Sequence, residues 1–180
     1  MNIASAYLEL IIGPMFSGKT SRLVDIYKQC KFCNIPVSVI NHSIDIRYHD
    51  TMLSTHDKVM IPCIKTNTIS EILDKLDEAQ VIIINEGQFF DDLYTTVVSL
   101  LLKGKKIYVG GLDGDFERKK FGQILDLIPV CDKVTKLTSL CSICKDGKPG
   151  IFSKRLTMET AQTIVGSDIY IPVCRTCYNQ

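Results

Sequence analysis

The sequence lacks an excess of charge of either sign, since 21 basic and 20 acidic residues leave a formal net charge of +1 over 180 residues. Proteins that bind nucleic acid usually carry a clear basic footprint, so we expect no nucleic-acid partner. The sequence also lacks an apolar run of the ~20 residues that a membrane-spanning helix needs. Residues 1–5 lack the basic and then apolar pattern of a secretory signal. We therefore expect a cytoplasmic protein with no membrane partner.

Histidine is scarce, and the three histidines show no metal-ligand spacing supported by carboxylates, so we interpret them as surface residues. Cysteine is not scarce. Eight cysteines in a chain without a visible secretory signal favour reduced thiols or metal ligands over disulfides. Cys30 and Cys33 form one C-x-x-C pair near the end of a helix-compatible segment, where we expect a structural role. The length and the 46% apolar content allow one domain of ordinary size and a small appendage.

Residues 8–20 organise the rest of the chain. Residues 8–12 form a short apolar run typical of a buried parallel strand, and residues 13–20 match the phosphate-binding pattern G-x-x-x-x-G-K-[ST]. A helix beginning near Gly18 would direct its positive dipole end at the bound phosphates. We expect Lys19 to reach the β- and γ-phosphates and the Thr20 hydroxyl to serve Mg²⁺. The predicted phosphate-binding residues are Gly13, Pro14, Met15, Phe16, Ser17, Gly18, Lys19 and Thr20.

A second apolar run, residues 81–84, predicts a central strand that leads directly into Asn85 and Glu86. Phosphate-loop enzymes usually hold Mg²⁺ through a carboxylate at such a strand end, but here the expected aspartate is Asn85. Glu86 is the one carboxylate at the strand tip, so we predict that it is the general base for a substrate hydroxyl. The alternative is a glutamate that merely lies on the surface or caps the strand end.

Strand and helix patterns alternate along residues 8–137. This alternation predicts an α/β fold of the P-loop, RecA-like type, with a mostly parallel sheet flanked by helices on both faces. Further strands are expected at 36–41, 59–63, 107–111 and 133–137, and helices at 20–30, 67–78, 90–103 and 124–130. The helix at 67–78 has a possible capping box, with Thr68 or Ser70 as the cap and Glu71 as its partner. Ligand-binding segments are expected at the carboxyl ends of the strands, namely 13–20, 42–57, 85–88 and 112–121.

Two more C-x-x-C pairs lie near the C-terminus. Their spacing predicts a four-cysteine, structural zinc site formed by Cys141, Cys144, Cys174 and Cys177. We therefore divide the chain into a nucleotide-binding domain at 1–138 and a zinc-binding lobe at 139–180. Within the lobe, segments 151–156 and 161–170 are typical of a hairpin that could cover a substrate. Phe116 and Phe121, in the loop at 112–122, either cover a flat ligand or anchor that loop to the core.

Several longer motifs resemble the type II thymidine kinase family of cellular and poxviral enzymes, over about residues 8–178. These motifs are Gly-Pro-Met-Phe-Ser-Gly-Lys-Thr at 13–20, Asp-Ile-Arg-Tyr at 45–48, Thr-His-Asp at 55–57, Glu-Gly-Gln-Phe-Phe at 86–90, Leu-Asp-Gly-x-Phe-x-Arg-Lys-x-Phe-Gly at 112–122, Val-x-Lys-Leu-Thr at 134–138, Ser-Lys-Arg-Leu at 153–156 and Val-Cys-Arg-x-Cys-Tyr at 173–178. The resemblance implies transfer of the ATP γ-phosphate to the 5′-hydroxyl of thymidine, with deoxyuridine as a possible substrate, to give dTMP in nucleotide salvage. It also implies Mg²⁺, a structural Zn²⁺ and a homotetramer.

The resemblance further implies that Glu86 accepts the 5′-hydroxyl proton. It adds four residues to the ATP and phosphate site, namely Asp45, Arg47, Asn85 and Gln88. It implies a nucleoside site formed by Met15, Phe89, Leu112, Phe116, Phe121, Ser153, Ala161, Gln162, Thr163, Ile164, Val165 and Tyr170, with much of the base read by backbone groups. Arg155 or Arg118 is expected to help with phosphate charge.

Three residues depart from the family pattern: Asn85 replaces an aspartate, Asp115 a small residue such as threonine, and Lys120 a proline. Asn85 leaves open an alternative, a nucleotide-binding protein with weak or no kinase activity. A nucleic-acid-dependent ATPase is a further alternative, against which the balanced charge argues.

Overall fold

The computed structural model describes residues 6–45, 52–54, 59–162 and 169–180. Within these residues the largest sheet has six strands in the order β5-β2-β6-β7-β1-β8, and each neighbouring pair is parallel. The strands are β1 (Tyr7–Ile12), β2 (Val37–His42), β5 (Ile64–Thr66), β6 (Val81–Asn85), β7 (Lys106–Gly111) and β8 (Lys133–Lys136). The predicted α/β architecture is confirmed.

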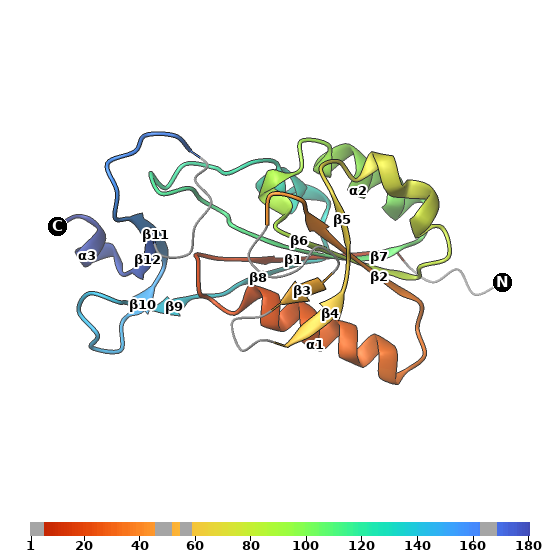
Figure 1. The fold of residues 1–180 in the computed structure, drawn as a ribbon, viewed down its shortest axis with the longest axis horizontal. Helices are drawn as coiled ribbons and strands as arrows, with labels where there is room; N and C mark the ends of the chain where they lie inside the picture. The colour runs from red at the N-terminus through yellow and green to blue at the C-terminus, as the bar shows by residue number, and fades with distance from the viewer. Residues whose placement is uncertain (1–5, 46–51, 55–58, 163–168) are drawn as a thin grey trace.

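Helices cover both faces of this sheet (Figure 1). Helix α1 (Lys19–Phe32) packs its apolar side chains on one face, where Leu23 and Ile26 meet Ile11 and Ile83. The opposite face is covered by α2 (Leu93–Leu102) and the 3₁₀ helices η1 (Ser70–Leu76) and η3 (Ile124–Val130). β6 is buried along its whole length because both of its faces are covered. None of the helices in the described residues is both long enough and apolar enough to span a membrane.

The strand predicted at 59–63 is confirmed as β4 (Met60–Pro62). It pairs antiparallel with β3 (Met52–Ser54) and therefore lies outside the parallel main sheet. The edge strand of the main sheet next to β2 is β5. Pro62 has no backbone N–H to donate to a ladder, which suits a short outer pair better than the sheet itself.

The predicted cap of the 67–78 helix was also wrong. That segment forms the shorter 3₁₀ helix η1, and its free N–H groups are capped by Asp92, far away in the sequence. The Asp92 carboxylate accepts hydrogen bonds from the backbone N–H groups of Ile69 (3.2 Å) and Ser70 (2.7 Å). Capping-box patterns describe contacts within one turn, so a cap from a distant segment is not visible to them.

The C-terminal segment forms a small lobe at one end of the sheet (Figure 1). Its elements are β9 (Ser139–Leu140), β10 (Pro149–Gly150), β11 (Phe152–Arg155), β12 (Tyr170–Val173) and α3 (Arg175–Tyr178). β11 and β12 form the predicted antiparallel hairpin, but its second strand begins only at Tyr170 and not near residue 161. The division of the chain at residue 138 stays a prediction.

A buried carboxylate joins two strands at the amino end of the sheet. Glu9 of β1 accepts hydrogen bonds from Tyr7 (3.0 Å) and Thr135 (2.7 Å), and Lys133 lies 3.2 Å away. Burial raises the pKa of the Glu9 carboxyl, but the hydrogen bonds from Thr135, Lys133 and Tyr7 outweigh burial and hold the pKa below its ordinary value. Ionised Glu9 therefore stabilises the contact between β1 and β8.

We expect Glu9→Gln to lower the free energy of unfolding at pH 7 by about 1–3 kcal/mol, because charged hydrogen bonds are lost. Since the folded pKa is depressed, this contribution is complete above the unfolded pKa of ~4.3 and is lost as the pH falls through the folded value. Denaturant unfolding of both proteins across pH 3–7 measures the difference, which should shrink below about pH 4. The control is Glu78→Gln at an exposed position; an equal effect of both substitutions would contradict a role for the buried network.

Candidate active site

The phosphate-binding pattern forms a tight loop between β1 and α1. Gly13 has φ +149° and a Cβ there would collide with the Leu137 carbonyl oxygen, so the loop requires glycine at this position. Lys19 begins α1, and its Nζ donates to the Pro14 carbonyl (2.6 Å) and the Ser17 hydroxyl (3.4 Å) across the loop. The helix amino end and this ammonium group together form an anion-binding surface.

Glu86 follows β6 directly and has a left-handed backbone, with φ 55° and ψ 41°. Such a conformation is costly for a residue with a side chain and is concentrated at functional sites. Gln88 holds the carboxylate, because its Nε2 donates to Glu86 Oε2 at 2.7 Å. The orientation of the Gln88 amide is set by the Leu112 N–H, which donates to its Oε1 at 3.0 Å. A neighbouring strand end therefore fixes the position of Glu86.

One cavity connects the phosphate loop with the Glu86 carboxylate. Its lining contains the loop residues from Met15 to Thr20, the polar residues Asp45, Glu86 and Gln88, and four aromatic rings in addition to that of Phe16 in the loop. The rings belong to Phe89, Phe116, Phe121 and Tyr170. Phe89 and Phe121 meet edge to face with their centroids 5.5 Å apart. The phosphate loop can therefore bind an anionic group, and the aromatic rings, which we call the aromatic chamber, can hold a flat apolar group.

The lobe contacts this cavity directly. The Ser153 hydroxyl of β11 accepts a hydrogen bond from the Met15 N–H (3.0 Å), and both residues line the cavity. Ser153 is 5% exposed. This hydrogen bond therefore joins the hairpin to the phosphate loop, although the two residues are 138 positions apart in the sequence.

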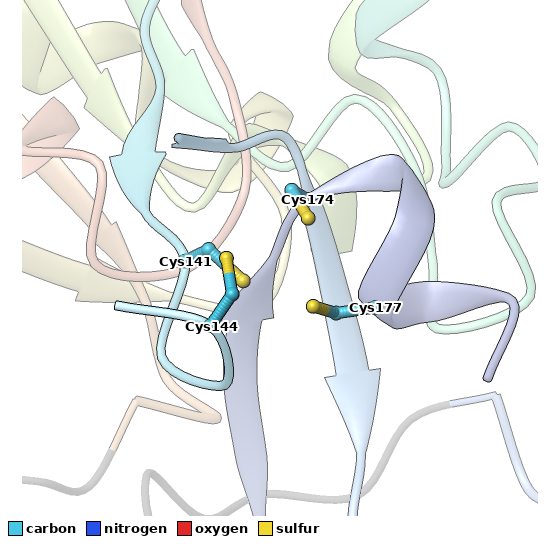
Figure 2. Close-up of side chains that lie close together, drawn as sticks. All are labelled: Cys141, Cys144, Cys174 and Cys177. Carbon is cyan, nitrogen blue, oxygen red and sulfur yellow. The ribbon is translucent and has the colours of Figure 1, made fainter. Parts of the chain in front are cut away.

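The four predicted zinc ligands converge in the lobe (Figure 2). The sulfur atoms of Cys141, Cys144, Cys174 and Cys177 all lie within 4.8 Å of one another. A tetrahedral zinc ion with Zn–S bonds of ~2.3 Å needs sulfurs about 3.8 Å apart, so the cluster fits zinc. Burial raises the pKa of the Cys141 thiol, but hydrogen bonds from the backbone around it outweigh burial and lower its pKa to about 6. The pKa values of the Cys144 and Cys177 thiols are raised, mainly by the hydrogen bond between Cys144 and Asp146 and by the burial of Cys177. The convergence of the four sulfur atoms, and not these pKa shifts, is what supports a zinc site.

Comparison with known proteins bears on this site. A sequence model of the family described as thymidine kinase matches residues 6–178. The thymidine kinase of Sheeppox virus (strain KS-1) is 40% identical over 173 residues, which cover 96% of each chain. That of Choristoneura fumiferana entomopoxvirus is 41% identical over 179 residues, again covering 96% of each. The chain belongs to the thymidine kinase family.

The match extends beyond viruses. The thymidine kinase of Oryza sativa subsp. japonica is 40% identical over 179 residues, which cover 95% of this chain and 65% of the rice protein. Among solved structures, domain III of the Thermotoga maritima replication initiation protein DnaA aligns with a TM-score of 0.44 at 16% identity, covering 72% of this chain and 54% of that one. A similarity of that size supports no conclusion about the function of this chain.

Most predicted site residues of this thymidine kinase family member line the one cavity. Gly13, Pro14, Asn85 and Ala161 do not. Gly13 packs against the Leu137 carbonyl oxygen, and the Pro14 carbonyl accepts a hydrogen bond from Lys19. The Ala161 carbonyl accepts a hydrogen bond from Arg155. Arg47, Thr163, Ile164 and Val165 lie outside the described residues.

Three lining residues, Ile44, Gly114 and Asp115, were not among the predicted site residues. Ile44 directly precedes the motif at 45–48, and Gly114 and Asp115 lie within the motif at 112–122. Asp115 is 6% exposed and organises its own loop, since its Oδ1 accepts from the N–H groups of Glu117 and Lys119, each at 2.9 Å. An aspartate that binds backbone N–H groups two and four residues ahead is a recognisable loop signal.

Asn85, the residue that departs from the family pattern, belongs to a buried amide chain. The Asn85 amide donates to Asn41 Oδ1 (3.0 Å), and the Asn41 amide donates to Asp45 Oδ2 (3.1 Å). An ionised Asp45 can only accept, so Asn41 must turn its amide nitrogen toward Asp45 and its oxygen toward Asn85. Asn85 therefore supports the orientation in which the Asn41 amide donates to Asp45 at the cavity.

We expect Asn85→Asp to lower the free energy of unfolding by about 1–3 kcal/mol, because the new carboxylate would face the Asn41 oxygen with no donor between them. Thermal and denaturant unfolding at pH 7, without added nucleotide or magnesium, measure the change. The control, Gln29→Glu, introduces the same charge at an exposed helix position. Unchanged stability would contradict the amide chain. In a separate kinase assay, an active variant beside an inert wild type would favour the alternative of a nucleotide-binding protein.

Proposed function

We propose that this protein is a phosphotransferase that moves the γ-phosphate of ATP to the 5′-hydroxyl of thymidine and gives dTMP in nucleotide salvage. The observation that carries the proposal is the single cavity shared by the phosphate loop, the Glu86 carboxylate and four aromatic rings. Membership of the thymidine kinase family supports the same assignment.

Positioning and charge neutralisation supply most of the catalysis in phosphoryl transfer. In our proposal the backbone N–H groups of the loop and Lys19 bind the β- and γ-phosphates. The aromatic chamber holds the thymine base, which places the sugar between that chamber and the loop. Glu86 then accepts the proton of the 5′-hydroxyl as the oxygen attacks the γ-phosphorus and the bond to the bridging oxygen of ADP breaks.

Gln88 is best explained as a positioning residue for Glu86 and not as a phosphate ligand. Its amide nitrogen is engaged by Glu86 and its amide oxygen by the Leu112 N–H. The left-handed backbone of Glu86 directs the carboxylate into the cavity, and Gln88 limits its rotation. A base held in this way pays less ordering entropy at the moment of reaction.

A magnesium ion would be held by the Thr20 hydroxyl and the phosphates, and it would neutralise charge that develops on the transferred group. Thr20 lines the cavity beside Lys19, and the buried Asp45 lines it as well. The neutral Asn85 supports Asp45 from behind. We propose that Asp45 supplies the negative charge on the metal side that an aspartate at position 85 would otherwise supply.

The proposal is tested with a phosphorylation assay that contains ATP, Mg²⁺ and thymidine, deoxyuridine, deoxycytidine or deoxyadenosine in turn. We expect turnover with thymidine, weaker turnover with deoxyuridine, and formation of the 5′-monophosphate and ADP in equal amounts. ATP binding without monophosphate formation from any nucleoside would overturn the proposal. The Lys19→Met variant, in which phosphate binding is lost, controls for contaminating kinases.

We further propose that the enzyme assembles as a homotetramer in the cytoplasm, as the family resemblance implies. Sedimentation equilibrium over a range of protein concentrations tests the assembly, and a monomer at every concentration would contradict it.

A further inference from the structure

Arg155 is buried in the lobe, close to the cavity but not part of its lining. It ends β11, is 8% exposed, and is absent from the residues that line the cavity. An arginine is almost never buried unless its charge and its donors are paired. The partners of its guanidinium group therefore indicate its role.

All five N–H donors of the Arg155 guanidinium are used by the protein itself. Nε donates to the Tyr170 hydroxyl (3.2 Å), Nη1 to the Glu159 (2.8 Å) and Ala161 (2.6 Å) carbonyls, and Nη2 to the Gln162 carbonyl (3.0 Å) and the Tyr170 hydroxyl (2.6 Å). A guanidinium group has five donors and no more. In this arrangement no donor remains for a phosphate group, contrary to the expectation from the sequence.

The same guanidinium group also contacts Phe116, which lines the cavity. Its central carbon lies 3.7 Å from the centroid of the Phe116 ring, within the range of a strong cation–π contact. Phe116 belongs to the loop at 112–122, whereas the carbonyls bound by Arg155 belong to residues 159–162. One buried cation therefore joins two segments that are distant in sequence.

Two further contacts hold these segments in the same arrangement. The Gln162 amide donates to Asp115 Oδ2 (2.8 Å), and the Tyr178 hydroxyl donates to the Phe116 carbonyl (2.5 Å). Asp115 carries this contact where the family pattern has a small residue. The loop at 112–122 is thus connected to the lobe through Arg155, Asp115 and Tyr178.

We propose that Arg155 is a positioning residue for the nucleoside, and that it acts through Phe116, Gln162 and Tyr170, which all line the cavity. The proposal rests on the function proposed above. Arg155 pre-orders the nucleoside side of the cavity and leaves the phosphate side to Lys19. Without it, the nucleoside would have to order these three side chains on binding, which weakens affinity.

Arg155→Lys and Arg155→Met test the proposal, since lysine keeps the charge but loses the planar fork. We expect both to raise KM and Kd for thymidine about 10- to 100-fold, with KM for ATP changed less than about 3-fold. Steady-state kinetics and calorimetric titration with thymidine give these values. Arg175→Lys and Arg175→Met are the controls, because Arg175 lies in the same lobe over the Phe152 ring and outside the cavity lining.

A different split of the constants would overturn the proposal. A fall in kcat with unchanged thymidine affinity would place Arg155 on the transferred phosphate, and an equal rise in both KM values would make its role merely structural. If the wild type fails to phosphorylate thymidine at all, it is the proposed function that fails. If the wild type is active and KM for thymidine does not move, the positioning role alone fails.

Tyr170→Phe provides a second test in case the Arg155 variants do not fold. It keeps the ring that lines the cavity but removes the hydroxyl that accepts two of the Arg155 hydrogen bonds. We expect a rise of about 3- to 10-fold in KM for thymidine, and no additional rise when Tyr170→Phe is combined with Arg155→Lys. Unchanged KM in Tyr170→Phe, or fully additive effects in the double variant, would contradict the proposal.

Discussion

Glu86→Gln is expected to lower kcat for thymidine phosphorylation about 10²–10⁴-fold, the usual contribution of a positioned general base. Glutamine has nearly the same size and can still accept a hydrogen bond from Gln88, which now donates to Glu86 at 2.7 Å. The cavity should therefore keep its shape while it loses the group that accepts the proton. Because this interaction matters mainly in the transition state, kcat and kcat/KM should fall together.

Steady-state kinetics measure this effect, and thymidine titration should show a Kd close to that of the wild type. Glu71→Gln is the matched control, since Glu71 is an exposed glutamate at the start of η1, remote from the cavity lining. Turnover of Glu86→Gln near the wild-type rate would remove Glu86 from the chemistry. It would leave the carboxylate as a structural group at the end of β6.

Cys177→Ser, or removal of zinc by a strong chelator, is expected to abolish measurable kinase activity, with a loss greater than about 100-fold. Structural zinc in small domains contributes about 10–16 kcal/mol of apparent binding free energy, which is available for folding. Within the described residues, the buried cluster of the lobe consists of Val173 and three of the cysteines, and Cys144 and three partly buried apolar side chains pack against it, so the metal ligands make up much of this core. The lobe also carries Ser153, which binds the Met15 N–H, and Tyr170 of the cavity lining.

Metal analysis of the purified wild type should show stoichiometric zinc, and the variant should show almost none. Cys33→Ser, at an exposed cysteine outside the cluster, should keep both zinc and activity. Thermal unfolding of the variant should lose cooperativity in the lobe first, while β1, β6 and β7 remain folded around their own core. Full activity in a zinc-free preparation would contradict this dependence.

Local patterns were enough for much of the fold. Residues 81–84 are continuously apolar and residues 8–12 are apolar except for Glu9, a pattern typical of strands covered on both faces, and both segments lie in the main sheet. The helix after the phosphate loop begins at Lys19, within one residue of the expected start. Gly104, directly after the helix expected at 90–103, has φ +76°, the left-handed conformation that glycine often adopts at a helix C-terminus. Each of these features depends on neighbours within a few residues.

The wrong cap and the unexpected strand pairing have one physical cause in common, which is dependence on distant partners. η1 is capped by Asp92 and not by Thr68 or Ser70, because a carboxylate from another segment reaches its free N–H groups. The strand at 59–63 lies outside the main sheet, because β4 pairs with β3 whereas β2 pairs with β5. The local pattern of residues 59–78 predicts neither result.

The sequence by itself determined the chemistry that is available: the phosphate loop at 13–20, the acid at position 86, and four cysteines with the spacing of a zinc site. Spacing is sufficient there because loop curvature, strand ends and paired C-x-x-C turns are local geometries. Only the tertiary structure decided how each polar group is used. Arg155 donates all of its hydrogen bonds to residues of the lobe, and Gln88 donates to Glu86. A buried polar group binds whichever partners the folded chain brings within reach.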